Sequence, residues 1–466
     1  MIRVFNQYVA IKSVLLVMVE SLIVALSLVG AVGLRFWGNH GLYESVVQVP
    51  LFPLKALIIV ITLQLCFYYN DLYDFHMLRG RQEQLVSVGQ AVGQACVLLG
   101  VLYFAVPDLI IGRGVFLISI ALGATLIAAL RFAFEGKWYT GALKQKVLIL
   151  GTGELADTVA RHFTSRPDLN LSIVGFLKSG DDAVVSLTAD QKVLGKLQDL
   201  VDVVRVTRAE KVIVALKERR LILPVRELVR LRMEGIVVED AQSTLSALSG
   251  RVCLDTLQPS WFVFSEGFRR SKVLLAVKRQ VDIVCASLGM VLSSPVMLLV
   301  ALAIRLDSRG PVIYRQQRVG RGGQCFNVLK FRSMAQDAEK AGAQWACPGD
   351  QRVTRVGAFI RRYRLDEFPQ FINVIRGDMS FVGPRPERPE FVENLRNVIP
   401  FYDERHTVRP GITGWAQVQY VYGASVEDAR RKLEYDLFYL KNMSIMFDIA
   451  IIFHTIRTIM SGRGGR

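Results

Sequence analysis

The chain has 466 residues, 52% of them hydrophobic, and a formal net charge of +16; its mean hydropathy is +0.33. The length predicts about three domains, and this hydrophobicity exceeds that of an ordinary soluble protein and indicates membrane segments. High hydrophobicity with positive charge favours lipid or phosphorylated partners over nucleic acid, and the scattered cysteines, without a C-x-x-C pair, argue against a disulfide framework or a zinc site.

Four apolar stretches in the first third of the chain each approach the ~20 residues that cross a bilayer as a helix. They cover residues 13–34, 49–69, 88–106 and 109–133. The third contains Gln90 and Gln94, so a buried soluble helix is the alternative there. We predict a four-helix transmembrane bundle over residues 1–136. Positive residues close the fourth stretch and place the following domain in the cytoplasm; they are Arg131, Lys137, Lys144 and Lys146.

An α/β rhythm follows over residues 145–245 and predicts a Rossmann-like domain with a doubly wound sheet. Expected strands cover 146–150, 172–176, 211–215 and 235–238. The first strand runs into a G-x-G-x-x-A turn with Gly151 and Gly153, which could hold a pyrophosphate at a helix N-terminus. The second strand lacks the usual acidic ribose ligand at its end, and Asp181 and Asp182 come later. A scaffold whose glycines serve tight packing is therefore favoured over a bound dinucleotide.

A linker over 246–270 leads to a last domain over 271–466, which opens with a long apolar run at 281–306. Ser294 and Pro295 lie at its middle, where proline must bend or break a helix. Both flanks are positive, with Lys278 and Arg279 before the run and Arg305 and Arg309 after it. Since a crossing segment has asymmetric flanks, this symmetry favours a re-entrant hairpin that returns to the cytoplasm. A kinked crossing is the alternative. Farther on, residues 426–440 and 444–460 are expected to be helical.

The densest cluster of reactive residue types lies between residues 361 and 386. Adjacent Asp366 and Glu367 cannot face each other on a helix, but one could attack phosphorus while the other holds a divalent cation. An isolated Asp-Glu pair is usually solvated surface. Here a rigid Gly-Pro-Arg-Pro turn presents Arg385, and further cations come from Lys330, Arg332 and Arg318. Such a set neutralises pyrophosphate charge and so predicts a phosphate-transfer site.

The last 190 or so residues resemble the bacterial polyprenyl glycosylphosphotransferase family. The matching segments are KR..D at 278–282, SP at 294–295, GPVIYRQQRVG at 310–320, KFRSM at 330–334, LDEFPQFINVIRGDMSFVGPRPE at 365–387, RPGITGWAQV at 409–418 and YDLFYLKNMSIMFD at 435–448. The whole chain resembles the large family members that start exopolysaccharide assembly. Its motifs are most similar to those of the sugar transferases found with exosortase loci. The α/β segment, without its ribose acid, is where the chain departs from the pattern.

The resemblance implies a mechanism and a location. Asp366 would attack the phosphorus of a UDP-sugar and release UMP, leaving a phosphosugar–aspartate that a polyprenyl phosphate then attacks. Glu367 would bind Mg²⁺ and Arg385 would hold phosphate. Lys330 and Arg332 would support the site, and Asp436 would be a further acidic member. The enzyme would be a multi-pass protein of the bacterial inner membrane, with its active site facing the cytoplasm.

Two other classes of protein are alternatives. A membrane nucleotide-sugar dehydratase or epimerase would need a second dinucleotide fold and a Tyr-x-x-x-Lys pair, which we do not find after residue 250. A non-catalytic scaffold that binds lipid would need neither the paired carboxylates nor the Gly-Pro-Arg-Pro turn. We also expect that the chain can form a homodimer. The sequence does not identify the transferred sugar.

Overall fold

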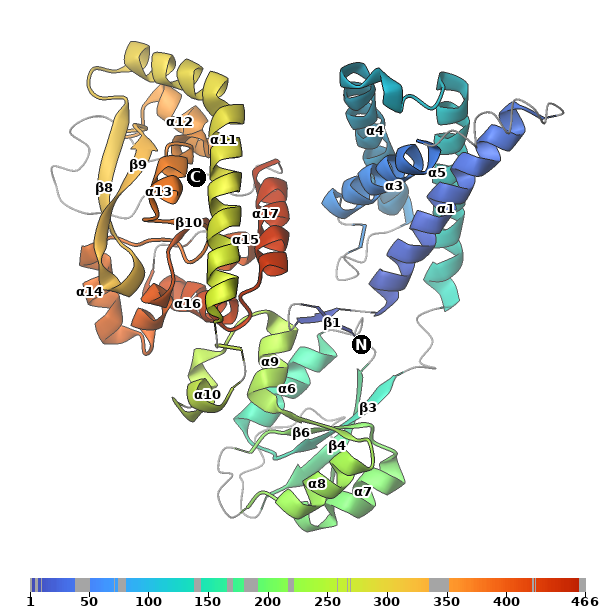
Figure 1. Ribbon diagram of the computed structural model, residues 1–466. Coiled ribbons are helices and arrows are strands. Elements are labelled where there is room, and N and C mark those ends of the chain that lie inside the picture. The colour runs from blue at the N-terminus through green and yellow to red at the C-terminus, as the bar shows by residue number, and fades with distance from the viewer. Residues whose placement is uncertain are drawn as a thin grey trace. The chain divides into compact units, whose positions relative to one another are not determined.

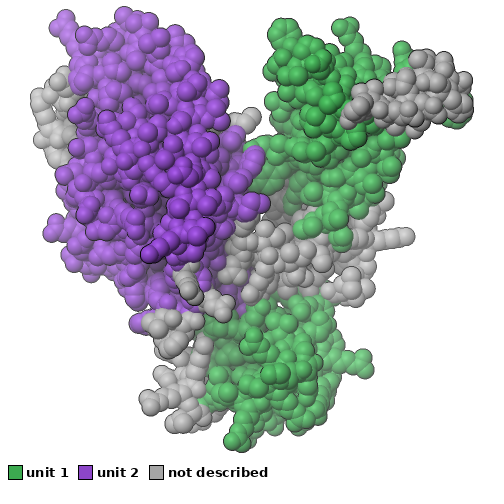
Figure 2. Space-filling view, in the orientation of Figure 1, with its two compact units in different colours: residues 1–4, 8–240 green, residues 5–7, 241–466 purple. Residues whose placement is uncertain are grey.

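The computed structural model describes residues 2–4, 7–9, 11–37, 51–70, 72–73, 81–137, 144–165, 171–179, 192–216, 222–257, 259–265, 267–268, 270–334, 352–420, 423 and 425–460. Asp181 and Asp182 lie outside these residues. The chain forms two compact units, one of residues 1–4 and 8–240 and the other of 5–7 and 241–466 (Figure 2). The structure is mostly helical (Figure 1).

The first unit begins with four long apolar helices. They are α1 (Ile11–Arg35), α3 (Phe52–Tyr69), α4 (Arg81–Ala105) and α5 (Arg113–Lys137). Each is long and apolar enough to cross a membrane. The short strands β1 (Ile2–Val4) and β2 (Gln7–Val9) precede them, and a 3₁₀ turn at Pro107–Leu109 separates the last two. The predicted third apolar stretch is thus a helix despite its glutamines.

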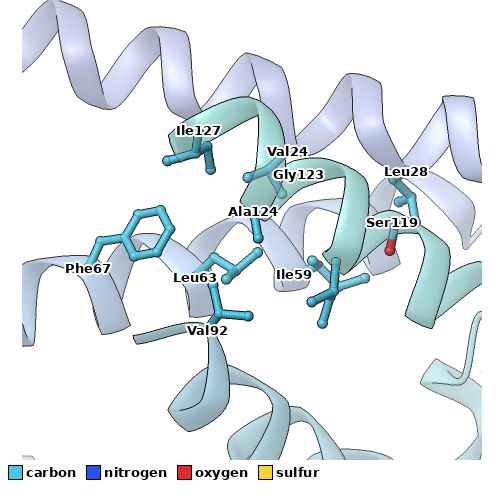
Figure 3. Close-up of a pocket in the computed structure, with 11 residues that line it drawn as sticks. Val24, Leu28, Ile59, Leu63, Phe67, Val92, Ser119, Gly123, Ala124 and Ile127 are labelled. Atoms are coloured by element: carbon cyan, nitrogen blue, oxygen red, sulfur yellow. The ribbon is translucent and has the colours of Figure 1, made fainter. Parts of the chain in front are cut away.

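The four apolar helices contribute to one buried core. Leu28, Ile59, Leu99 and Ile127 each belong to a different helix, and each is at most 2% exposed. A cavity of about 10 Å³ inside this core is lined mostly by apolar side chains, among them Phe67, with Ser119 as a polar member (Figure 3). That space is close to what one water needs, so the cavity is a packing gap and has no room for a substrate.

The rest of the first unit contains a parallel sheet of five strands in the order β5-β4-β3-β6-β7. The strands are β3 (Gln145–Leu150), β4 (Leu171–Lys178), β5 (Val193–Lys196), β6 (Lys211–Val214) and β7 (Val237–Asp240). The helices between them are α6 (Glu154–Thr164), α7 (Leu200–Thr207) and α8 (Val225–Met233). The prediction of a parallel α/β sheet is confirmed, and β5 is a strand that the sequence pattern did not indicate.

The second unit is built around one very long helix. It contains α9 (Ala241–Ser249), α10 (Pro259–Phe264), α11 (Lys272–Asp307), α12 (Arg355–Arg362), α13 (Gln370–Arg376), α14 (Pro389–Val398), α15 (Trp415–Gln419), α16 (Val426–Lys441) and α17 (Ile445–Met460). An antiparallel pair joins β8 (Ile313–Val319) to β9 (Cys325–Phe331), and a parallel pair joins β10 (Ser380–Val382) to β11 (Gly411–Thr413). The two late helices predicted from the sequence are confirmed as α16 and α17.

Helix α11 contains Pro295 and remains helical on both sides of it. Proline removes one backbone donor, and the carbonyl that loses its partner four residues earlier is that of Val291. The Ser294 hydroxyl donates to this same carbonyl at 2.8 Å. The serine therefore replaces the hydrogen bond that its neighbour deletes. Figure 1 shows α11 changing direction along its length, as a proline inside a helix predicts.

Buried polar bonds fix α11 to strand β10. The Lys278 ammonium donates to the carbonyl of Val382 at 3.0 Å and pairs with Asp448 at 2.6 Å. One turn later, the Asp282 carboxylate accepts from the Ser380 hydroxyl at 3.0 Å and from the Phe381 amide at 2.9 Å. The strand leads directly into the Gly-Pro-Arg-Pro turn, so α11 and the segment carrying Arg385 are held in one framework.

Candidate active site

Asp366 and Glu367 lie in a single 3₁₀ turn, Leu365–Glu367, which directly precedes α13. The chain enters this turn through Arg364, whose φ of 55° is in the left-handed region. In a 3₁₀ turn, adjacent side chains diverge by about 120°, because three residues make one turn. The two carboxylates therefore have different neighbours, although they are adjacent in sequence and buried to a similar degree, at 9% and 8% exposure.

Two cations surround the Glu367 carboxylate. Its Oε1 atom accepts a hydrogen bond from Arg385 at 2.9 Å and lies 3.7 Å from the ammonium of Lys330. Burial alone would raise the pKa of Glu367, but the charges of Arg385, Lys330 and Arg364 outweigh burial and hold that pKa below its usual range. Glu367 is therefore a fixed carboxylate that stays ionised at neutral pH.

The neighbouring Asp366 has a different environment. Among the residues that the structure describes, the ion pairs from Arg385 and Lys330 are made to Glu367 and not to the Asp366 carboxylate. Burial raises the pKa of Asp366, and the negative charge of Glu367 adds to the effect, while Lys330 opposes it. Such a carboxylate is less stabilised as an anion and is correspondingly better suited to attack an electrophile.

The cation Arg385 is presented by two interlocked turns. At Gly383 a Cβ atom would meet the carbonyl oxygen of Arg409 at 2.5 Å, and at Gly411 it would meet the Gly383 nitrogen at 2.1 Å. The parallel pairing of β10 with β11 brings these two segments together. Only glycine permits such a close approach of backbones, so the spacing of glycines in the two motifs fixes the position of Arg385.

The structure places the remaining sequence-predicted site residues around this centre with distinct contacts. Lys330, from β9, lies at the carboxylates. Arg318 donates to the carbonyl of Pro386 at 3.1 Å and so holds the Gly-Pro-Arg-Pro turn. Arg332 donates to the carbonyls of Arg309 and Ser308 at 2.9 and 2.7 Å, just beyond the end of α11. Arg318 also donates to the Gln316 side chain at 3.0 Å, and Arg332 to the Ser308 hydroxyl at 2.9 Å, so both arginines hold the chain around the site.

Asp436 is buried, at 1% exposure, and pairs with Arg405 at 2.8 Å. The same Arg405 donates to the carbonyl of Arg385 at 2.9 Å. Burial raises the pKa of Asp436 to about 6, although the charge of Arg405 opposes this shift. Asp436 thus reaches the site through Arg405, which the sequence interpretation did not single out.

Asn373 is a second residue whose importance the sequence interpretation missed. It is fully buried, accepts from the Leu329 amide at 3.0 Å and donates to the carbonyl of Asn327 at 2.8 Å. Its amide therefore bonds β9 as a neighbouring strand would and fixes the distance between Lys330 and the paired carboxylates. A polar residue in the otherwise apolar run of α13 was the signal that could have found it.

The glycine turn of the parallel sheet serves packing. Gly151 has a φ of +111°, and a Cβ atom there would lie 2.7 Å from the carbonyl oxygen of Ala215. Gly151 directly follows β3, and Ala215 directly follows the neighbouring strand β6. The strand order reverses between β3 and β6, and the carboxyl ends of the strands at such a point are where α/β sheets bind ligands. The contact uses the glycine for close backbone approach. Gly153 precedes α6 and has open space around it.

A divalent cation fits the donor set at the paired carboxylates. Groups of three or more His, Cys, Asp or Glu side chains that could hold a metal are not found among the described residues. Mg²⁺ does not need such a group, since it takes carboxylate oxygens together with water and substrate phosphates. Both cation contacts of Glu367 that the structure describes are made to Oε1, which leaves Oε2 for a metal.

Comparison with protein families matches residues 273–462 to a model described as bacterial sugar transferase. A second model, described as CoA-binding domain, matches residues 69–226. The first match contains the whole carboxylate site, and the second overlaps both the apolar helices and the parallel sheet.

Curated relatives extend over more of the chain. A relative from Aeromonas hydrophila is 47% identical over 241 residues, 52% of this chain and 56% of the relative; it is named UDP-N-acetylgalactosamine-undecaprenyl-phosphate N-acetylgalactosaminephosphotransferase. The UDP-glucose:undecaprenyl-phosphate glucose-1-phosphate transferase of Escherichia coli K12 is 36% identical over 68% of both chains. The protein of the same name from Xanthomonas campestris is 30% identical over 87% of this chain and 86% of its own length.

Proposed function

This chain belongs to the bacterial polyprenyl-phosphate sugar-1-phosphate transferases, and we propose that it transfers a sugar phosphate from a UDP-sugar to undecaprenyl phosphate and releases UMP. The observation that carries this proposal is the unequal environment of the two adjacent carboxylates. Glu367 is paired with two cations, whereas Asp366 lies beside it, buried and less stabilised as an anion. One carboxylate is thus suited to hold charge and the other to react.

The proposed reaction has two balanced steps. An Asp366 oxygen forms a bond to the phosphorus that carries the sugar, and the bond from that phosphorus to the bridging oxygen breaks, so that UMP leaves. An oxygen of undecaprenyl phosphate then forms a bond to the same phosphorus, and the Asp366 carboxylate is released. Arg385 and Lys330 lie where they can neutralise charge on the transferring phosphate. Glu367 would hold Mg²⁺, which supplies further neutralisation of pyrophosphate oxygens.

The proposed membrane placement rests on α11 and on the four apolar helices. A straight helix of the 36 residues of α11 would be about 54 Å long, well beyond the ~30 Å hydrocarbon core. Its apolar side chains are exposed, with Leu292 at 70% and Leu298 at 74%. A bent helix that enters the bilayer and returns explains this exposure and the positive flanks. We place both ends of α11 and the active site on the cytoplasmic face of the inner membrane.

A buried ion pair in the first unit supports an even number of crossings before the sheet. Glu20 of α1 lies 2.7 Å from Arg131 of α5, and it accepts a hydrogen bond from Tyr73, just after α3, at 2.6 Å. The early part of α1, the end of α3 and the late part of α5 therefore meet at one level. Helices that alternate in direction across the membrane would bring these segments together.

UMP release is the direct test of the proposed activity. Purified protein in detergent would be given Mg²⁺, undecaprenyl phosphate and a panel of UDP-sugars. UDP-N-acetylgalactosamine and UDP-glucose come first, because relatives are named for these donors. We expect UMP release with one donor of the panel and its dependence on the lipid in multiple-turnover conditions. Absence of release with every donor of a broad panel would contradict the proposal.

The covalent step has its own test. With donor but no lipid, the wild-type protein should gain one sugar phosphate, and peptide mass spectrometry should locate it on Asp366. Asp366→Asn should form no adduct and lose activity by roughly 10³-fold or more. Asp403→Asn is the matched control, because Asp403 is 57% exposed and lies outside the site. An adduct on any other residue would reassign the nucleophile.

Accessibility of single cysteines tests the membrane placement. Cysteines introduced at exposed Val273 and at Ile313 lie before and after the apolar part of α11. In intact cells, neither should react with a membrane-impermeant maleimide, and both should react in inverted vesicles. Labelling of the two positions from opposite sides would show that α11 crosses the membrane.

A further inference from the structure

A basic cavity lies in the C-terminal unit, and none of the residues at the paired carboxylates lines it. Its volume is about 40 Å³, and its wall includes Arg270, Arg279, Arg321 and Arg409. One water needs ~10–15 Å³ in such a cavity, so this one has room for a small polyatomic anion. Four guanidinium groups around a space of that size would repel one another in the absence of a negative charge.

The acidic groups near the cavity do not balance these arginines. Lys278 and Asp282 also line it, and Lys278 is neutralised by Asp448 at 2.6 Å. The Asp282 carboxylate is already bonded to Ser380 and the Phe381 amide. Glu404 adds a further negative charge near Arg270. Among the residues that the structure describes, four arginines therefore face one bonded aspartate and one outlying glutamate, which leaves positive charge in excess.

Structural duties explain only part of this arginine cluster. Arg279 donates to the carbonyls of Val374 and Ile375 at 2.6 and 2.8 Å, and Arg409 donates to the carbonyl of Gly377 at 2.9 Å. These bonds satisfy the end of α13. Arg270 and Arg321 make no such bond to α13 among the residues described.

Arg270 is the arginine of the cavity whose hydrogen bonds are least complete among the residues described. Arg270 donates to Thr407 through long bonds of 3.3 and 3.2 Å, and its Nε atom is buried without a hydrogen-bond partner. Burial lowers the pKa of Arg270, and the charge of Arg321 lowers it further. Burial likewise lowers the pKa of Arg409, with Arg279 and Arg321 adding to the shift. An anion in the cavity would accept a hydrogen bond from the unpartnered Arg270 nitrogen and would offset the repulsion among the arginines.

We propose that this cavity is a second phosphate-binding site, which takes the phosphate of a monoester or diester and is separate from the catalytic carboxylates. Phosphate is the anion whose tetrahedral oxygens match several guanidinium forks at once. Its source is either the head group of an anionic membrane lipid or a soluble phosphate compound. The occupant would also brace the active site, because Arg409 immediately precedes the turn that interlocks with Gly383, and Ser380 and Val382 of β10 line the cavity.

Binding is measured on the full chain carrying Arg385→Gln, so that phosphate at the catalytic centre contributes less. Calorimetric titration with inorganic phosphate forms one arm. Native mass spectrometry of protein from nanodiscs of phosphatidylglycerol and phosphatidylcholine forms the other. We expect saturable binding of phosphate, of phosphatidylglycerol or of both, with phosphatidylcholine as the lipid control. Binding of phosphate alone identifies a soluble occupant, and retention of phosphatidylglycerol alone identifies a lipid.

Arg321→Gln is the test variant, since Arg321 is exposed and lies in a short turn, where its loss should leave the fold intact. It should weaken binding at least about tenfold, as loss of a charge-assisted bond predicts. Arg396→Gln changes the same charge on an exposed part of α14 and should leave binding unchanged. Equal binding by these two variants, or no binding of either probe to the parent protein, would overturn the proposal. The readout is binding, so it is independent of whether UMP is released.

Discussion

The buried pair of Lys278 and Asp448 offers a quantitative test of how α11 is fixed to the catalytic unit. Asp448→Asn keeps the shape of the side chain but removes the carboxylate 2.6 Å from the Lys278 ammonium. The ammonium then retains the carbonyl of Val382 at 3.0 Å and the carboxylate of Asp282 at 3.9 Å. Breaking a buried ion pair from one side typically costs 3–5 kcal/mol, because a buried charge loses its partner.

Because the Lys278 ammonium keeps two contacts, we expect Asp448→Asn to lower the free energy of unfolding by about 3 kcal/mol, the lower end of this range. For a unit of about this size, 1 kcal/mol lowers the unfolding temperature by about 2–4 °C, so we expect a decrease of about 6–12 °C. Thermal unfolding in detergent can be followed by tryptophan fluorescence. Trp261 and Trp415 both belong to the hydrophobic core of the unit that contains the pair and therefore report its unfolding.

Two comparisons decide whether the reasoning holds. Glu427→Gln removes a carboxylate that is 61% exposed and pairs with Arg431 at 3.2 Å, and it should cost less than about 1 kcal/mol. Lys278→Met combined with Asp448→Asn removes both charges of the 2.6 Å pair, so the double variant should lose less stability than the sum of the single variants. A decrease for Asp448→Asn no larger than that for Glu427→Gln, or strict additivity of the pair, would refute the argument.

Three further outcomes follow from single contacts. Ser294→Ala removes the hydroxyl that bonds the carbonyl freed by Pro295 and should destabilise the protein by about 1 kcal/mol, while Ser294→Thr should retain most of it, as thermal unfolding would show. Because the folded pKa of Asp436 is raised to about 6, this carboxyl stabilises the fold most while it is protonated, and the wild-type protein should lose about 3 kcal/mol of stability as pH rises from about 4 to 7. Asp436→Asn should not show this loss. Denaturant titration of both proteins across this pH range checks the difference. Gly383→Ala should lower UMP release at least about tenfold, because its Cβ would lie 2.5 Å from the carbonyl of Arg409 and displace the turn that carries Arg385. Unchanged turnover would contradict this prediction.

Periodicity and composition predicted the main elements of the fold but not their edges. A long apolar run in a membrane can satisfy its backbone hydrogen bonds within the run only as a helix. Hydrophobicity alone therefore predicted α1, α3, α4, α5 and α11. The central strands β3 and β6 were predictable because each contains a buried apolar run, residues 147–150 in β3 and 212–214 in β6. The edge strand β5 was missed, since its four residues are mostly exposed and are defined by pairing with β4.

The grouping of the candidate site residues was predictable where a motif keeps those residues close in sequence. Asp366, Glu367 and Arg385 lie within one block, and Lys330 lies in a motif of its own. The sequence did not indicate which groups the arginines around the site would bind. Arg332 bonds the chain just beyond α11, and Asp436 acts on Arg405, because tertiary packing decides which backbone carbonyls remain in need of a donor.

The unequal environments of Asp366 and Glu367 arise from two features that neither residue has alone. The tight turn aims the two carboxylates in different directions, and Asn373 fixes β9 so that Lys330 approaches Glu367. Arg385 approaches the same oxygen from the glycine-locked turn. A nucleophile held by two cations would have to break strong bonds before it could attack. The arrangement of cations therefore supports the proposal that Asp366 forms the bond to phosphorus. An exchange of the two residue types, Asp366→Glu with Glu367→Asp, should abolish adduct formation although both charges remain.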